Sequence, residues 1–331
     1  MPDQRIRELL ETPIAQRDLT WLKWAVLEAV KFEFATIPPY LTAYWSIKNS
    51  GALAAKIILP IIIEEMLHMA LMCNLAAGLG MPPALADTSV VPTYPGPLPG
   101  GIKPGFELGL EGLSIAVIRK FMEVEYPEGG PVVEAVAETF PTIGAFYHAI
   151  SNALRTVNPQ LDTSKQLAGP LGLTKLSTVD EALDAIDTVT RQGEGTPTSP
   201  IDTGPNDLAH FYRFGELLHQ RRLVIDEQTQ KWSYTGVPVP NPDVWPAAPV
   251  PHGGYSKGDV SEAVWQMLDR FDRSYSQMLG DMAEAWSTGS QSKLDSAIGT
   301  MSFGLSDAAI ELMSTQRPDG LGTYAPCFRL T

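Results

Sequence analysis

Residues 61–69 read Ile-Ile-Ile-Glu-Glu-Met-Leu-His-Met and place two acids and a histidine inside an otherwise apolar run of helical character. Burying a carboxylate or an imidazole is costly unless the group is paired, hydrogen-bonded or bound to a metal. Glu65 and His68 are three residues apart, so they project from one side of a helix and can offer oxygen and nitrogen to one ion. The same Glu-x-x-His spacing returns at Glu216 and His219. This repeat predicts a metal site.

Each half of the repeat has an alternative interpretation. Glu65 and His68 can form a buried ion pair without metal, and Glu64, four residues before His68, can take the place of Glu65. The three-residue spacing at the second site favours Glu65.

The second half of the repeat lies close to positive charge. Arg221 and Arg222 follow His219 directly, and they can pair with Glu216 and His219 at a solvated helix end. Metal binding and surface ion pairing therefore both remain open for this segment.

Apolar residues at helical spacing predict an all-α fold whose core is a four-helix bundle. Between the second and third helices, residues 80–105 contain seven prolines and read as a long crossover, which lets those two helices run parallel. The first helix is expected to end before Pro38, and Pro60 is expected to kink the second helix or to force a fresh start before Glu64. The four core helices are expected at about 19–37, 51–79, 108–126 and 207–223.

The remaining segments are expected to decorate this bundle. Residues 127–205 read as an insertion with helices near 141–156 and 178–191, and residues 222–226 and 231–235 can pair as a small hairpin. A C-terminal extension, 252–331, is expected to add two further helices. These lie at about 258–287 and 291–316.

The first and third core helices each supply an inward acid. Glu33 stands between Phe32 and Phe34 in register with apolar neighbours, although a surface glutamate is the common alternative. On the third helix, Glu125 lies one turn beyond apolar residues, whereas Glu123 falls over basic ones, where an exposed ion pair is the simpler explanation. Glu125 is therefore the preferred inward residue.

The inward polar residues make up the ligand set by which one class of four-helix bundles holds two metal ions. That class uses one Glu from each of two helices and a Glu-x-x-His from each of the other two. Mixed carboxylate and imidazole ligands suit iron or manganese and do not exclude zinc. The predicted ligands are Glu33, Glu65, His68, Glu125, Glu216 and His219.

Three further residues are candidates for the same site. Glu194, in the glycine-rich segment 192–196, and His210 are each either a ligand or a partner of a ligand, with a capping or core hydrogen bond as the alternative. Tyr212, one turn before Glu216, is the predicted catalytic residue, a proton or electron donor near the metals. The alternative for Tyr212 is a packed core aromatic.

Composition narrows the function classes. A formal charge of -14 with a pI near 4.8 argues against nucleic acid and against an anionic membrane surface as partners. The start of the chain lacks a signal peptide's apolar core, and the longest aliphatic run is interrupted by Pro60, so neither export nor a membrane span is expected. Cys73 and Cys327 read as free thiols. The expected location is cytoplasmic.

Several segments together resemble the ferritin-like superfamily of di-iron carboxylate proteins, and within it the ferritin-like domain family named for iminophenyl-pyruvate dimer synthases. The resemblance implies one ferritin-like domain over 1–331, whose helix bundle holds two metal ions, in a protein of secondary metabolism. It also raises Glu194 and His210 as ligand candidates. The synthases themselves are much longer chains. The resembling segments are 32–41, 63–69, 121–128, 192–196, 210–217 and 324–328.

These observations lead to the expectation of a non-haem dimetal oxidoreductase that activates dioxygen on a small organic, amino-acid-derived molecule. The cofactor expected is a pair of iron ions, with manganese or zinc as alternatives. Glu65 and Glu216 are expected to bridge or flank the ions. No nucleotide-binding GxGxxG follows a strand, so an external electron donor or the substrate is expected to supply electrons. A homodimer is a further expectation, and a non-catalytic iron-binding protein or a hydrolase are the alternatives.

Overall fold

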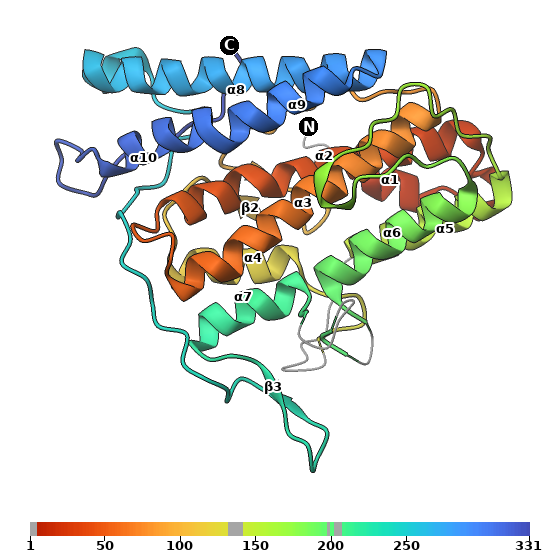
Figure 1. Ribbon diagram of the computed structural model, residues 1–331, viewed down its shortest axis with the longest axis horizontal. Helices are drawn as coiled ribbons and strands as arrows, with labels where there is room; N and C mark the ends of the chain where they lie inside the picture. The colour runs from red at the N-terminus through yellow and green to blue at the C-terminus, as the bar shows by residue number, and fades with distance from the viewer. Residues whose placement is uncertain (1–4, 132–141, 197–198, 202–206) are drawn as a thin grey trace.

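The computed structural model describes residues 5–131, 142–196, 199–201 and 207–331. Two long helices, α2 (Leu19–Trp45) and α3 (Leu53–Gly78), pack side by side along most of their length and form the centre of the molecule (Figure 1). The Asp18 side chain caps α2 by accepting a hydrogen bond from the backbone N–H of Trp21 at 2.9 Å. Both helices are apolar nearly all round, as expected of helices buried on several sides.

Four shorter helices cover one face of this pair. α4 (Ile115–Val124) packs against α7 (His210–His219), and α5 (Ile143–Val157) packs against α6 (Val179–Glu194). Figure 1 shows the first couple beneath one end of α2 and α3 and the second beneath the other end. The expected four-helix bundle is present, but its third and fourth helices are each replaced by two shorter helices. Helix ends therefore lie halfway along the bundle.

The first helix does not end at residue 37 as expected, because α2 continues through Pro38 and Pro39 to Trp45. Pro39 has no N–H to donate to the carbonyl of Ala35, four residues earlier. The hydroxyl of Tyr94, from the crossover, donates to that carbonyl instead, at 2.8 Å. A side chain distant in sequence therefore satisfies the group that the proline leaves free.

The other helix boundaries shift in smaller ways. α3 contains Pro60 without a fresh start before Glu64. The third core helix begins at Ile115, after the capping residue Ser114, rather than near residue 108. The fourth spans only His210–His219. α6 extends to Glu194, beyond the expected helix end near residue 191, so it takes in the first three residues of the segment 192–196.

A second helical layer covers the opposite face of α2 and α3 (Figure 1). It contains α8 (Glu262–Thr288), α9 (Gln291–Gly299) and α10 (Ser306–Ser314). A π-helical segment, Thr300–Leu305, separates α9 from α10 where one helix was expected. The expected C-terminal helices are thus present, with the second divided.

The remaining elements are short. The expected hairpin is formed by β3 (Val224–Ile225) and β4 (Trp232–Ser233), and a second two-stranded pair joins β1 (Gly96–Pro97) to β2 (Glu107–Leu108) within the crossover region. Both pairs are antiparallel. The other short elements are α1 (Arg5–Glu11) and the 3-10 turns Ile14–Gln16, Pro99–Gly101, Pro170–Gly172 and Lys257–Asp259.

Among the described helices, α3 alone is long and apolar enough to cross a membrane by length and composition. Within the fold, 61% of its apolar window is buried, which is the behaviour of a core helix. One continuous apolar cluster takes in buried side chains from Ile6 to Phe328. Three polar residues of α3, namely Glu65, His68 and Asn74, are therefore buried within this apolar core.

Candidate metal centre

The two long helices bring together a first group of three ligand types. Glu33 from α2 meets Glu65 and His68 from α3, and each of the three side chains is at most 4% exposed. The Nδ1 atom of His68 lies 3.5 Å from Oε2 of Glu33 and 3.5 Å from Oε1 of Glu65. One donor atom from each residue falls within 4.8 Å of the others, which is close enough to surround one ion.

A second group of three shares Glu65 with the first. Glu125 directly follows α4, and His210 is the first residue of α7. The Nδ1 atom of His210 lies 2.9 Å from Oε1 of Glu65 and 3.7 Å from Oε2 of Glu125. The same carboxylate oxygen of Glu65 therefore faces both imidazoles, whose rings stack with centroids 5.5 Å apart. We refer to the five residues of the two groups as the Glu/His cluster: Glu33, Glu65, His68, Glu125 and His210.

A hydroxyl group holds one oxygen of each cluster carboxylate, so that the other oxygen faces an imidazole. Two of these hydroxyls belong to α2, and the third belongs to α5. A fixed second partner of this kind orients a metal-binding carboxylate. The donors are Thr36 to Oε2 of Glu65 at 2.5 Å, Tyr40 to Oε1 of Glu125 at 2.5 Å, and Tyr147 to Oε1 of Glu33.

Both histidines present Nδ1 to the cluster because their Nε2 atoms have other partners. Nε2 of His210 donates to the carboxylate of Glu64 at 2.9 Å, and Nε2 of His68 lies 2.7 Å from the amide oxygen of Gln192. Arg213 in turn pairs with Glu64, its Nη1 lying 2.9 Å from Oε2. An imidazole held through one nitrogen leaves the lone pair of the other free for a metal.

Electrostatics within the cluster compensate for burial. Burial alone raises the pKa of Glu65, but the contacts with His210 and His68 outweigh this and lower it well below its usual value. Burial alone lowers the pKa of His68, and the contacts with Glu33 and Glu65 reverse this and raise it to about 10. Burial raises the pKa of Glu33 and of Glu125. Near neutral pH the imidazole of His68 therefore holds a proton that a divalent cation would replace in a metal-loaded site.

The residues present fit a metal-loaded state. Nδ1 of His210 is buried and makes no hydrogen bond with any described residue, although it lies within 3.7 Å of two carboxylate oxygens. Such an atom costs free energy unless another partner satisfies it. Buried carboxylate and imidazole donors in two overlapping groups are compatible with a dimetal site, and the donor types suit iron, manganese or zinc.

Glu194 lies beside the cluster rather than within either group of three. It is the last residue of α6, and its Oε2 accepts a hydrogen bond from the backbone N–H of Glu128 at 2.9 Å. A Cβ on Gly144 would stand 2.6 Å from that oxygen, so only glycine leaves room for the carboxylate. Burial raises the pKa of Glu194 to about 8, and the charges of Glu128 and Glu125 add to the rise.

The second Glu-x-x-His of the sequence is placed elsewhere, which corrects the expected ligand set. Glu216 accepts hydrogen bonds from Arg222 at 2.6 Å and from the backbone N–H of Leu223 at 2.8 Å. His219 stacks on the ring of Tyr234. Nine residues separate His210 from His219, about 13 Å along a helix, so only the first reaches the level of Glu65. The structure thus shows the arginine pairing that the sequence left open.

The structure also shows where the other candidate residues from the sequence lie. Glu125 is 7% exposed and belongs to the cluster, while Glu123 is exposed. Tyr212 packs in a second apolar cluster, where its ring meets Phe211 edge-on at 5.1 Å. Among the described contacts, Tyr40 and Tyr147 are the tyrosines that donate to cluster carboxylates.

Sequence reasoning missed the residues that hold the ligands in place. For two of them a signal existed, because Thr36 and Tyr40 follow Glu33 by three and seven residues and so share its helix face. The expected helix end at residue 37 hid Tyr40. Tyr147, Gln192 and Arg213 come from distant elements and carry no such signal.

Known proteins resemble this chain in sequence and in fold. A family model described as Ferritin-like matches residues 26–219, a range that includes the whole Glu/His cluster. Dichlorochromopyrrolate synthase from Lentzea aerocolonigenes is 25% identical over an alignment covering 82% of this chain and 31% of that protein. The chain therefore spans about a third of that relative's length.

A solved structure, a ferritin-like protein from Caulobacter vibrioides, superposes with a TM-score of 0.64 at 21% identity, covering 94% of this chain and 97% of that one. This likeness confirms the expected fold. The family model, which matches more than half of the residues, establishes the relationship. The chain belongs to the Ferritin-like family.

Proposed function

We propose that this protein is a non-haem dimetal oxidoreductase that uses dioxygen to oxidise a small organic molecule of secondary metabolism. The observation that carries the proposal is the pair of buried Glu/His groups that share Glu65. Family membership supports a dimetal site, and a relative named as a synthase supports an enzymatic role. An amino-acid-derived substrate, an external electron donor, a homodimer and a cytoplasmic location are parts of the same proposal.

The roles of the five cluster residues follow from their positions. Glu33 and His68 would hold one ion, Glu125 and His210 would hold the other, and Glu65 would contribute to both, because it belongs to both groups of three. Iron is the first candidate on the basis of the donor set, with manganese and zinc as alternatives. Bound iron would supply the redox chemistry with dioxygen that organic side chains lack.

The surrounding residues keep this centre dry and hold its protons. The ring of Tyr40 packs edge-on against Phe121 and is 5.2 Å from Phe214, so apolar rings shield the hydrogen bond from Tyr40 to Glu125. Burial raises the pKa of Tyr40 and of Tyr147, so both hydroxyls stay protonated and continue to donate. Glu194, with its pKa near 8, can hold a proton beside Glu125 at neutral pH and is our candidate proton donor.

Metal analysis tests the proposal. The wild-type protein should contain metal after purification or after anaerobic loading with Fe(II), and Glu65→Ala should lose both ions because Glu65 belongs to both groups of three. His68→Ala should lose mainly one ion. A wild-type protein that stays metal-free after loading would contradict the proposal.

Oxygen consumption separates the proposed chemistry from its alternatives. The Fe(II)-loaded protein should consume dioxygen, and Glu65→Ala should not. A loaded protein that consumes none would point to hydrolysis or to a non-catalytic iron-binding role. Size-exclusion chromatography then addresses the iron-storage case, because a shell of many subunits elutes far from a monomer or dimer.

A further inference from the structure

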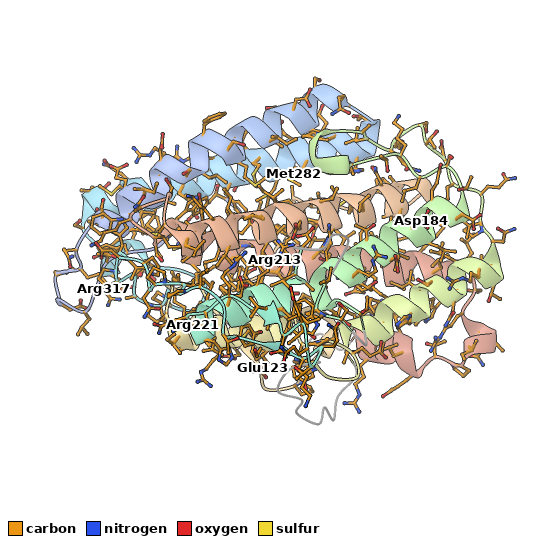
Figure 2. The ribbon with its side chains drawn as sticks, turned by 60° about the horizontal axis from the view of Figure 1, so that its bottom comes forward. Glu123, Asp184, Arg213, Arg221, Met282 and Arg317 are labelled. Carbon is orange, nitrogen blue, oxygen red and sulfur yellow. The ribbon has the colours of Figure 1, made fainter. Side chains whose placement is uncertain are left out.

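An apolar cavity lies between the central helices and the C-terminal layer. The cavity has a volume of about 260 Å³. Side chains from α2 and α3 form one wall, and side chains from α8, α9 and the π-helical segment form the other. Figure 2 shows Met282, one of the lining residues, on the side of α2 and α3 that faces the C-terminal helices, and Arg213 on the opposite side.

This cavity is separate from the metal centre. Neighbouring residues of α2 divide between the two sites, since Glu33 contacts His68 while Phe34 lines the cavity. The same division occurs on α3, where His68 joins the Glu/His cluster and Met69 lines the cavity. None of the five cluster residues is among the described lining residues. The layer formed by α2 and α3 therefore separates the two sites.

The lining indicates the chemistry of a ligand. No charged side chain occurs among the described lining residues, and Ser302 and Tyr275 carry their only hydroxyls. Charged molecules would lose their hydration in this cavity without compensation, which excludes them. Methionine side chains adapt their shape and make favourable contacts with aromatic rings, and rings on the wall prefer edge-on or offset partners. The lining methionines are Met66, Met69, Met278, Met282 and Met301, and the lining aromatic residues are Phe34, Tyr275, Trp286 and Phe328.

The volume indicates the size of the ligand. An engineered apolar cavity of roughly 150 Å³ stays dry and binds benzene. A cavity of about 260 Å³ has room for a second fused ring. A flat bicyclic molecule therefore matches both the size and the chemistry of this space.

One edge of the cavity opens toward solvent. Met66 and Ala70 of α3 are partly exposed, and Ser302 of the π-helical segment is exposed. A π-helical turn widens a helix locally and recurs at functional sites. This segment forms the rim at which a ligand would enter.

We propose that this cavity is a second small-molecule site, which binds an uncharged aromatic molecule of bicyclic size. The site is independent of the metal centre and goes beyond the proposed oxidoreductase function. Naphthalene is the probe that tests it. Naphthalene-1,5-disulfonate is the matched bicyclic molecule with a charge on each ring, and the uncharged lining should reject it because at least one charge would have to enter the cavity.

Titration calorimetry on the whole chain, as purified and after chelator treatment, should show saturable binding of naphthalene and none of naphthalene-1,5-disulfonate. Ala70→Phe and Ser302→Phe narrow the cavity from its rim and should each weaken binding at least tenfold. Ser292→Phe is the matched control, because Ser292 is exposed on α9 and does not line the cavity. Circular dichroism melting confirms that each variant is folded.

Crystals soaked in 2-bromonaphthalene should place the anomalous signal of bromine inside the cavity. Absence of saturable naphthalene binding to the wild type would overturn the proposal, as would unchanged affinity in both folded, narrowed variants. Bromine located only elsewhere would also overturn it. All of these readouts hold for metal-free protein, so their failure would leave the proposed function untouched.

Discussion

Each carboxylate of the Glu/His cluster divides its two oxygens between a hydroxyl and an imidazole. Tyr147 holds Glu33, Tyr40 holds Glu125, and Thr36 holds Glu65. The hydroxyls reduce the freedom of the carboxylates before any metal arrives, which lowers the cost of binding. In the proposed dimetal state, residues that do not touch the metal would therefore contribute to its affinity.

Removing one of these hydroxyls should weaken metal binding without unfolding the protein. We expect Tyr40→Phe and Tyr147→Phe each to lower metal affinity by roughly 10- to 100-fold, as is typical when a ligand loses its outer partner. Competition against a chromogenic chelator measures the change. Tyr44→Phe is the control, because Tyr44 lies one turn from Tyr40 on α2 and is only half-buried. Equal affinities in all three variants would show that the hydroxyls do not hold the ligands.

The pKa of His68 gives metal binding a defined pH dependence. Burial lowers this pKa, and the contacts with Glu33 and Glu65 more than compensate and raise it to about 10. Below that pH the imidazole of the metal-free protein carries a proton that an ion must displace. Apparent affinity should therefore rise as pH increases from 6 to 9, with protons released into a weakly buffered solution. Affinity that is flat over this range, with no proton release, would contradict the charge state inferred for His68.

At the scale of elements, the chain places ligands at helix ends as well as on helix faces. Glu33, Glu65 and His68 lie within long helices. Helical spacing predicted that Glu65 and His68 share one side of their helix, and apolar neighbours predicted that Glu33 faces inward. Glu125 and His210 lie where α4 ends and α7 begins. Apolar periodicity shows which face of a helix is buried. It does not show where along the bundle the end of one short helix lies beside the start of another. From spacing, the sequence therefore offered His210 only as a ligand or a partner of a ligand, and resemblance to a family raised it further.

The spacing rule also explains the misplaced pair. Glu216 and His219 have the same spacing as Glu65 and His68, but α7 carries them away from the cluster. A Glu-x-x-His pattern shows that two side chains share one face of a helix. It does not show whether that face lies against other acidic or histidine side chains. The arginines beside Glu216 were the signal that favoured the ion pair, and Arg222 forms it.

The continuation of α2 through Pro39 depends on Tyr94. We expect Tyr94→Phe to lower the free energy of unfolding by about 1 to 2 kcal/mol, because the buried carbonyl of Ala35 would lose its hydrogen bond. Urea denaturation measures this loss. Tyr255→Phe is the control, since the hydroxyl of Tyr255 is buried without a hydrogen-bond partner in the described structure and its removal should cost little. Equal losses in the two variants would argue against this role for Tyr94.

At the scale of the whole molecule, the end of the chain is tied to α8 by a buried ion pair. Asp272 is fully buried, and its carboxylate accepts hydrogen bonds from Nε of Arg329 at 2.7 Å and from the backbone N–H of Arg329 at 3.1 Å. Burial raises the pKa of Asp272, which the charge of Arg329 counteracts. This contact fixes the tail against the layer that closes the apolar cavity.

Breaking this pair from one side should be costly. We expect Arg329→Met to lower the free energy of unfolding by about 3 kcal/mol, because the carboxylate of Asp272 would be left buried and without its charged partner. The double variant Asp272→Leu with Arg329→Met should recover most of the loss, since it removes both charges. Chemical denaturation of the three proteins is the measurement. A double variant no more stable than the single one would show that the pair contributes through packing instead.

The layered arrangement was partly predictable. Apolar periodicity identified the bundle and the C-terminal helices, and the proline-rich crossover was recognised as a long connection. Three features arise from how layers pack: the division of the last two bundle positions, the π-helical segment and the apolar cavity. These features depend on contacts between residues far apart in sequence, which local patterns do not encode.

The most direct test of the central claim compares two histidines of the same helix. We predict that wild type and His219→Gln, loaded anaerobically with Fe(II), bind two ions per chain, and that His210→Gln binds at most one. Elemental analysis by mass spectrometry, after removal of loosely bound metal, gives the number. Loss of metal in His219→Gln with full retention in His210→Gln, or a wild type that binds none, would contradict the Glu/His cluster as the metal centre.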